Sequence, residues 1–104
     1  MKRIAFKMNL IKGYEEVYKK RHDEIWPELK LLLKQKGIKE YSIFLDEETN
    51  ALFAYLLIDD ATRLDDLPNE PELQKWWAYM RDIMEINEDN SPVTTPLREV
   101  FYLP

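Results

Sequence analysis

The chain has no cysteine, only two glycines and only one histidine among its 104 residues. Without thiols it can form no disulfide framework, no thiolate metal site and no thiolate nucleophile. Two glycines do not make a glycine-rich phosphate-binding loop, so we expect no nucleotide cofactor. One histidine excludes metal sites built from clustered imidazoles, and no spacing of carboxylates indicates a metal site of another kind.

Positive charge and long apolar runs are also scarce. Fifteen Lys and Arg residues against twenty Asp and Glu residues give a formal net charge of -5, which repels nucleic-acid phosphates and anionic membrane surfaces. The longest apolar run, Ala51–Ile58, is far shorter than the roughly 18 residues that cross a bilayer. Lys7 and Lys12 interrupt the stretch where a signal peptide would be apolar. We therefore expect a cytoplasmic protein that binds neither nucleic acid nor membranes.

The periodicity of apolar residues predicts one domain over residues 1–104. Alternation predicts strands, spacings of three and four predict helices, and Trp26-Pro27 separates two helical stretches. The predicted elements are a strand over 3–10, helical stretches over 13–25 and 27–37, strands over 38–46 and 50–58, a helix over 72–86 and a strand over 97–103. This order predicts an α+β, ferredoxin-like (split βαβ) fold, an antiparallel four-stranded sheet with its helices on one face.

The third predicted strand bears on assembly. Residues 50–58 show almost no alternation, which is typical of a strand buried on both faces. Helices on one side of a sheet cannot cover its other side, so we expect a second subunit there and hence a homodimer. The face on which Tyr41 lies stays open, because a turn one residue longer or shorter exchanges the two faces of its strand.

His22 is the residue best suited to proton transfer near neutral pH, because the ordinary pKa of histidine is about 6.5. Tyr18 lies four residues earlier, on the same side of the predicted helix. The residues alone leave open whether this pair is catalytic or a satisfied core or surface pair.

The adjacent Trp76 and Trp77 are the second unusual feature. Neighbouring helical residues point about 100 degrees apart, so both indoles are core only if the helix is covered over a broad arc. Otherwise one of them lines a cavity, where an aromatic face suits the C–H face of a sugar. The acidic pairs Asp59-Asp60 and Asp65-Asp66 are typical of solvated polar turns rather than of a paired-carboxylate site.

Several segments together resemble the L-rhamnose mutarotase family. They are Arg21-His22-Asp23-Glu24-Ile25-Trp26-Pro27-Glu28-Leu29, Trp76-Trp77-Ala78-Tyr79-Met80, Asn87-Glu88-Asp89-Asn90-Ser91-Pro92-Val93 and Glu99-Val100-Phe101-Tyr102-Leu103-Pro104. The resemblance runs from end to end of the chain. It implies a cytoplasmic homodimer of the dimeric α+β barrel type that interconverts the α and β anomers of L-rhamnose without a cofactor.

The resemblance also implies roles for five residues. His22 matches the proton donor of the family, and Tyr18, Tyr41, Trp76 and Trp77 match its substrate-binding positions. We expect protonated His22 to donate to the ring oxygen when the sugar opens and to recover that proton on closure. The catalytic base is not assigned, and the indoles are expected to form an apolar wall for the methyl end of the 6-deoxy sugar.

Two other functions are compatible with the predicted fold. One is a dimeric α+β barrel monooxygenase that oxidises aromatic or haem-like compounds, because fold alone does not decide function. The other is a non-enzymatic module that binds a small molecule without speeding anomer exchange.

Overall fold

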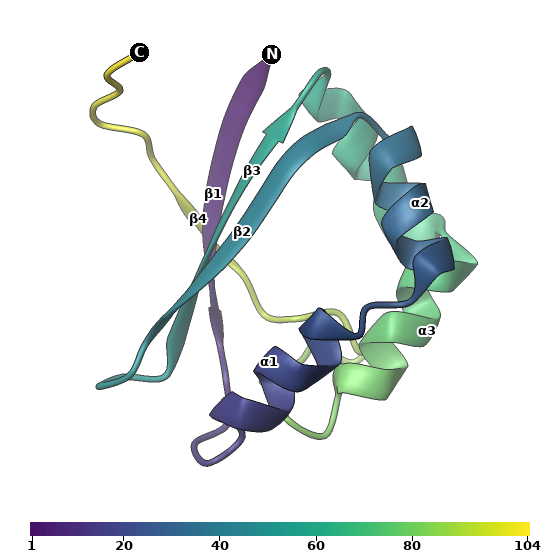
Figure 1. Ribbon diagram of the computed structural model, residues 1–104, viewed down its shortest axis with the longest axis vertical. Helices are drawn as coiled ribbons and strands as arrows, with labels where there is room; N and C mark the ends of the chain where they lie inside the picture. Colours follow the sequence, from purple (N-terminus) through teal and green to yellow (C-terminus); the bar gives the residue numbers. More distant parts are fainter.

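The computed structural model describes residues 1–104 as an antiparallel four-stranded sheet with all helices on one face (Figure 1). The elements are β1 (Lys2–Asn9), α1 (Glu15–Asp23), α2 (Pro27–Gln35), β2 (Ile38–Asp46), β3 (Ala51–Ile58), the 3-10 helix η1 (Ala61–Asn69), α3 (Pro71–Met80) and β4 (Thr95–Leu97). The strand order is β2-β3-β1-β4. The predicted ferredoxin-like fold is confirmed.

The strands place alternate residues on two faces that differ in cover. On the inner face, toward the helices, Met8 of β1 and Leu52 and Ala54 of β3 are buried in one core cluster with residues of α2 and α3. A smaller cluster at the other end of the sheet joins Ile38 and Ile58 to Leu67 of η1. No layer of this chain covers the outer face.

Within this chain the third strand is covered on its inner face only, and its predicted burial on both faces requires a second subunit and stays a prediction. Its inner side chains are buried, but Phe53 is 38% exposed and Tyr55 and Leu57 are only half-buried. The near-continuous apolar sequence of β3 therefore corresponds, within one chain, to a strand buried on one face only. A strand usually lacks the alternation of apolar and polar residues when other layers of the protein cover both of its faces.

A β-bulge at Lys39 determines which side chains of β2 point toward the helices and which point to the outer face of the sheet. Ile38 pairs with Ile58, and the next partners are Glu40 with Leu57, so one residue of β2 is extra. The extra residue shifts the inward-facing set of β2 to Tyr41, Ile43 and Leu45, which lie opposite the inner-face residues of β3. The bulge thus answers the open question about Tyr41, which faces the helices.

The predicted helix over 72–86 ends earlier, at Met80. Ile83 and Met84 are buried, as helical spacing indicated, but they lie in an irregular segment beside the end of β1. There the Ile11 N–H donates to the Ile83 carbonyl over 2.9 Å and the Glu85 N–H to the Asn9 carbonyl over 3.1 Å. Apolar spacing identified the buried residues, while pairing with β1 replaced the last helical turns.

The final strand is β4, at Thr95–Leu97, and the prediction of a strand over 97–103 is wrong for this chain. After Leu97 the chain leaves the sheet as a tail (Figure 1). Val100, Phe101 and Leu103 are each at least 77% exposed. No strand of the chain pairs with the tail, and its contacts with Arg3 involve Glu99 and Tyr102 and leave these apolar side chains in solvent.

Local signals at the other helix ends follow ordinary rules. Pro27 occupies the first turn of α2, and Trp26 before it is extended. Gly37 ends α2 with a φ of +92°, and a Cβ there would collide with the Asp59 carboxylate. Asp59 pairs with Arg63 at 3.3 Å and Asp60 accepts the Thr62 N–H, so this acidic pair has a structural role. No helix combines the length and the apolar composition that a membrane span requires.

Candidate active site

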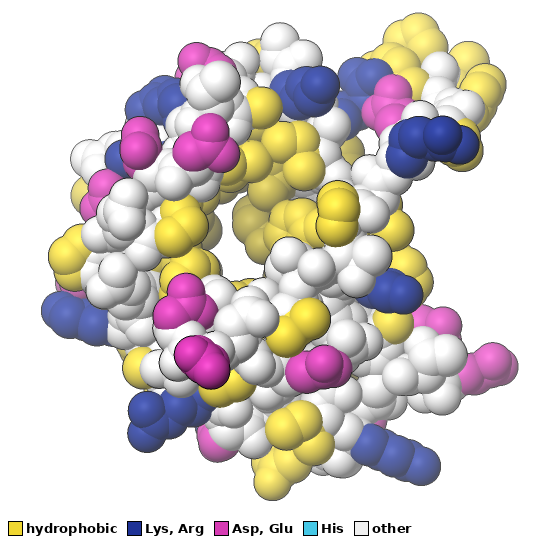
Figure 2. All heavy atoms as spheres, turned by 180° about the vertical axis from the view of Figure 1, so that it is seen from behind, with side chains coloured by type: hydrophobic (Ala, Val, Ile, Leu, Met, Phe, Trp, Pro, Cys, Tyr) yellow, Lys and Arg dark blue, Asp and Glu magenta, His cyan; other side chains and the backbone are white.

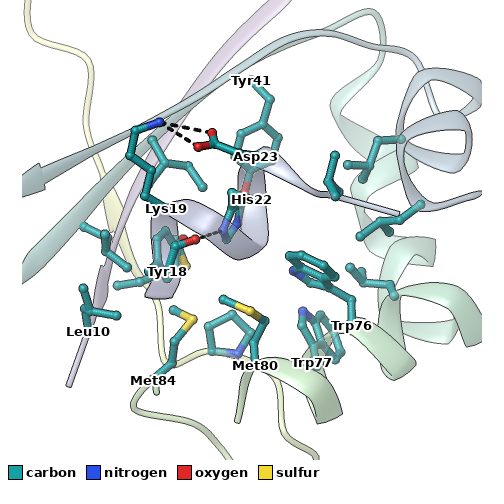
Figure 3. A pocket seen from close by; sticks show the side chains of 18 of the residues that line it. Leu10, Tyr18, Lys19, His22, Asp23, Tyr41, Trp76, Trp77, Met80 and Met84 are labelled. Carbon is teal, nitrogen blue, oxygen red and sulfur yellow. Dashed lines mark hydrogen bonds and ion pairs between the residues drawn. The ribbon is translucent and has the colours of Figure 1, made fainter. Parts of the chain in front are cut away.

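A cavity of about 800 Å³ lies between the inner face of the sheet and the helices. Figure 2 shows the molecule from behind, with a hollow between the two layers and hydrophobic side chains along its walls. All five predicted site residues, Tyr18, His22, Tyr41, Trp76 and Trp77, line this cavity. They come from three elements, α1, β2 and α3, so only the folded chain brings them together (Figure 3).

Helix α1 positions the phenol and the imidazole. Glu15 and Glu16 lie in its first turn and basic residues in its last, an arrangement that complements the helix dipole. Tyr18 and His22 are one turn apart on its cavity-facing side, and their rings stack with centroids 4.2 Å apart. Tyr18 is 8% exposed and His22 is half-buried, so the phenol lies in the core and the imidazole at the cavity wall.

The hydrogen bond of the His22 ring defines its chemistry. Nδ1 lies 3.0 Å from the Tyr18 carbonyl oxygen, and since a carbonyl only accepts, Nδ1–H is the donor. In the neutral ring Nε2 therefore has no hydrogen and presents a lone pair. The edge of Trp76 meets the imidazole at 89°, with centroids 5.3 Å apart, and limits how the ring can tilt.

Burial lowers the pKa of His22 below its ordinary value, because a charged ring loses solvation in the cavity. The hydrogen bond to the Tyr18 carbonyl and the charge of Asp23 favour the charged ring, but burial is the larger effect. The resting ring at neutral pH is therefore neutral, with Nε2 able to accept a proton.

The two phenols stay protonated at neutral pH. Burial raises the pKa of Tyr18, and the neighbouring Tyr41 adds to that increase. Tyr41 is 40% exposed as a whole residue, but its phenol group is crowded, and this burial raises its pKa to about 12. Figure 3 shows the Tyr41 side chain reaching from β2 toward His22. Both phenols can hold a hydroxyl as donor or acceptor, but neither supplies a phenolate.

The two adjacent indoles of α3 have different environments. Trp76 is 7% exposed and packs edge-on against Trp26, with centroids 5.1 Å apart, while Trp77 is half-buried. Trp26 does not itself line the cavity, so it supports Trp76 from behind. The sequence left open whether each indole lies in the core or lines a cavity. In the structure each indole packs partly against the core and partly forms the cavity wall.

An ion pair joins α1 to the turn that follows α3. Arg21, next to His22, donates to both carboxylate oxygens of Asp82 at 2.8 and 3.1 Å and to the Tyr79 carbonyl at 2.9 Å. Its guanidinium carbon lies 4.5 Å from the centroid of the Tyr79 ring. This cluster fixes α1 against the end of α3 and hence His22 against Trp76.

Among the cavity residues that sequence reasoning did not assign to the site are Met80, Met84 and Asn90. The methionines share the helical spacing of the tryptophans, which had assigned them to the core (Figure 3). Asn90 belongs to one of the segments that carry the family resemblance, but neither the resemblance nor a local pattern gave it a role in the site. No three His, Cys, Asp or Glu side chains lie close enough together to hold a metal ion.

Comparison with known proteins agrees with this arrangement. The model of the L-rhamnose mutarotase family matches residues 3–103. L-rhamnose mutarotases of Formosa agariphila and Bacteroides thetaiotaomicron are each 56% identical to the chain, over 99% of both sequences. A crystal structure titled as the L-rhamnose mutarotase of Formosa agariphila superimposes with a TM-score of 0.94, at 55% identity over 100% of both chains.

More distant structures share the fold alone. A crystal structure of an antibiotic biosynthesis monooxygenase superimposes with a TM-score of 0.60 over 94% of this chain and 97% of that one, at 10% identity. Such identity shows a common architecture and no common chemistry. The matches that cover the whole chain at more than half identity decide the assignment: the chain belongs to the L-rhamnose mutarotase family.

Proposed function

We propose that the chain interconverts the α and β anomers of L-rhamnopyranose in the cavity between sheet and helices, and that His22 moves the proton. The observation that carries this proposal is the half-buried imidazole, whose Nδ1 donates to the Tyr18 carbonyl and whose Nε2 is left as an acceptor. The family assignment names the sugar, and the cavity is lined by the only imidazole of the chain.

The proposed reaction requires one proton to move between two oxygens of the same carbon. Nε2 accepts the proton of the anomeric hydroxyl, the C1–O5 bond breaks as C1=O1 forms, and the imidazolium returns the proton to O5. Rotation about C1–C2 presents the other face of the aldehyde, and the same steps in reverse close the ring. Atoms balance without an external base, because His22 acts first as base and then as acid.

The other cavity residues bind and orient the sugar in this proposal. Tyr18 and Tyr41 keep their protons and can hold hydroxyls, and Trp76 and Trp77 offer apolar faces to C–H groups and to the methyl carbon. This proposal replaces the expectation that His22 rests in its protonated form. No cofactor has a part in any step.

Saturation transfer between the anomeric proton signals of L-rhamnose tests the activity. We expect the protein to accelerate the anomer exchange of L-rhamnose well above its rate in water. We expect a smaller acceleration for the anomer exchange of L-fucose and D-glucose. Equal exchange with and without protein would contradict the proposal, and would favour a module that binds without catalysis. Oxidation of an aromatic compound by the protein would instead favour the monooxygenase alternative.

We also propose that residues 1–104 act as one domain and pair as a homodimer through the outer face of the sheet. That face presents Phe44, 66% exposed, together with Phe53 and Leu97. Arg3 holds the start of the tail, donating to Glu99 at 2.8 and 3.0 Å and lying 3.4 Å above the Tyr102 ring. Val100, Phe101 and Leu103 of the tail stay in solvent, so the outer face and the tail both expose apolar side chains.

A second copy of the chain is the partner that best fits this surface. Two such faces related by a two-fold axis would bury each other, and each tail would have an apolar sheet to cover. Light scattering on the eluting protein tests this, and a mass near twice 12.6 kDa is expected. The proposal includes the cytoplasmic location that the family resemblance implies, which cell fractionation tests.

A further inference from the structure

The cavity is bordered on one side by a hairpin at residues 86–92. Ile86 and Pro92 pair across it, and both line the cavity. The Asn87 N–H donates to the Ser91 carbonyl over 2.8 Å, and the Asn90 N–H to the Asn87 carbonyl over 3.0 Å. Asn90 has a φ of +70°. This is the geometry of a tight turn followed by a left-handed residue, a position where glycine is the residue of least strain.

Most polar side chains of this hairpin are used to hold it. Asp89 accepts from the N–H of Ser91 at 3.0 Å and from its hydroxyl, and the Asn87 amide donates to the Ser91 hydroxyl at 3.1 Å. Glu88 and Asn90 are the exceptions, because neither side chain makes a hydrogen bond within the protein. Glu88 is exposed, whereas Asn90 is half-buried and lines the cavity.

Asn50 provides a direct contrast. It too has a left-handed backbone, with a φ of +61°, at the tip of the hairpin between β2 and β3. Its carboxamide, however, donates to the Glu15 carboxylate over 3.0 Å, and Asn50 does not line the cavity. One left-handed asparagine therefore has a structural partner, and the other has none and faces the site.

The chemistry of the cavity wall explains what the free carboxamide can do. Among the residues that line the cavity, Asn90 is the only one with an amide side chain, and none is a serine or threonine. An indole only donates and the neutral Nε2 only accepts, whereas a carboxamide does both at once. Trp77 and Asn90 together also border a smaller hollow of about 330 Å³, so the amide lies beside a wall proposed for the sugar.

We propose that the Asn90 carboxamide hydrogen-bonds a ring hydroxyl of the sugar at C2, C3 or C4 and thereby contributes to substrate specificity. This inference rests on the proposed function. It assigns to the hairpin a role in binding and not in proton transfer, because the amide does not titrate. The left-handed backbone points this side chain and no other polar side chain of the hairpin to the cavity.

The variant Asn90→Gly tests the inference, because glycine adopts the backbone of this position without strain. A purely structural role predicts an unchanged or more stable protein with normal kinetics. A role in binding predicts that the KM for L-rhamnose rises about threefold to tenfold while kcat changes little. This is the loss of affinity that removal of one hydrogen bond usually causes. Asn50→Gly is the matched control, and it should lower stability without raising KM.

Sugars that lack one hydroxyl identify the contact. L-Rhamnose analogues deoxygenated at C2, C3 or C4 are compared by NMR titration of binding to the wild type and to Asn90→Gly. The variant should bind one of the three analogues as well as the wild type does, and should bind the others and L-rhamnose more weakly. An equal loss for every sugar, or no loss for L-rhamnose, would overturn the role of Asn90.

Titration also separates this inference from the proposed function. If the wild type binds L-rhamnose without speeding exchange, the proposed activity fails, while weaker binding by Asn90→Gly still supports the contact. If the wild type speeds exchange and Asn90→Gly behaves identically, only the contact fails. Absence of any L-rhamnose binding by the wild type would overturn both.

Discussion

The two faces of the sheet use similar residues for different purposes. On β2, Tyr41, Ile43 and Leu45 face the helices, while Phe44 between them faces out and is 66% exposed. The inner face borders a cavity with one imidazole, two phenols and two indoles. The outer face has aromatic and aliphatic residues and no cavity. An apolar strand therefore does not reveal by its sequence which of its faces meets a substrate and which meets a partner.

The two faces of the sheet also differ in the environment that they give to polar groups. Inside, His22 loses solvation and its pKa falls, which makes it useful for proton transfer. Outside, Arg3 and Glu99 form an ion pair that keeps both groups charged, and burial by a partner would leave that pair satisfied. Changes on the inner face should thus alter activity, and changes on the outer face should alter assembly.

The largest expected effect is on the inner face. His22→Ala should lower the catalysed exchange rate by about a hundredfold to ten-thousandfold, because one acid–base group typically contributes that much. The rate is measured by saturation transfer, and circular dichroism checks the fold. Lys20→Ala, an exposed change on the same helix, is the control. A His22→Ala variant with the wild-type rate would remove His22 from the mechanism.

The corresponding change on the outer face is Phe44→Asp. A charge at the centre of an apolar interface should weaken the dimer by about thirtyfold or more. Sedimentation equilibrium measures the dissociation constant, and Phe44→Leu, which keeps the surface apolar, should stay dimeric. If Phe44→Asp and the wild type associate equally, the outer face is not the interface.

The dependence on pH should separate the faces without any mutation. The neutral imidazole accepts the proton, so the exchange rate should hold down to pH 6.5 and fall as the pH drops through the lowered pKa of His22. Dimerisation should not change over that range, since the apolar outer-face residues do not titrate there. His22 is the only histidine, so its ring signal can be followed directly by NMR. An inflection above pH 6.5 would contradict the lowered pKa.

Stability should follow the same titration. The unfolded chain binds the proton of His22 near pH 6.5, and the folded chain binds it only at lower pH, so the unfolded state holds more protons in between. The free energy of unfolding should therefore decrease as the pH falls from about 6.5 to the folded-state pKa of His22. Denaturation in urea at several pH values measures this, and His22→Ala should abolish this part of the slope.

The smallest expected effect concerns the support of the inner face. Arg21→Ala removes the link from α1 to Asp82 and to the Tyr79 carbonyl, and should lower the free energy of unfolding by about 1 kcal/mol. Urea denaturation measures the change. Lys19→Ala breaks an exposed ion pair with Asp23 and should lower the free energy of unfolding by a smaller amount. Equal costs would show that the Arg21 cluster does not stabilise the site.

Much of the fold was predictable because it depends on local patterns. Alternation identified β1, and the Trp26-Pro27 break and Gly37 located the two ends of α2. The four-residue spacing of Tyr18 and His22 placed both rings on one side of α1. The ends of α3 and β4 were not predictable, since they depend on pairing with β1 and on the lack of a surface for the tail.

The five residues predicted for the site lie around one cavity, but the protonation of the imidazole was not predictable. Family resemblance named five residues, and all five line one cavity. No local pattern could state that His22 is neutral, because neutrality follows from burial of the ring in the cavity. Its tautomer follows from the carbonyl of Tyr18 one turn back. Asn90 stayed hidden for a similar reason, since its role depends on a left-handed backbone next to a cavity.

The amino-acid sequence by itself determined the order of elements, the apolar spacing of each and the inventory of one imidazole among phenols and indoles, because these are local or compositional properties. Only the tertiary structure decided that Tyr41 faces the cavity. The reason is one extra residue, Lys39, in the pairing of β2 with β3. A strand repeats every two residues, so this single bulge moves the whole set of β2 side chains from one face to the other.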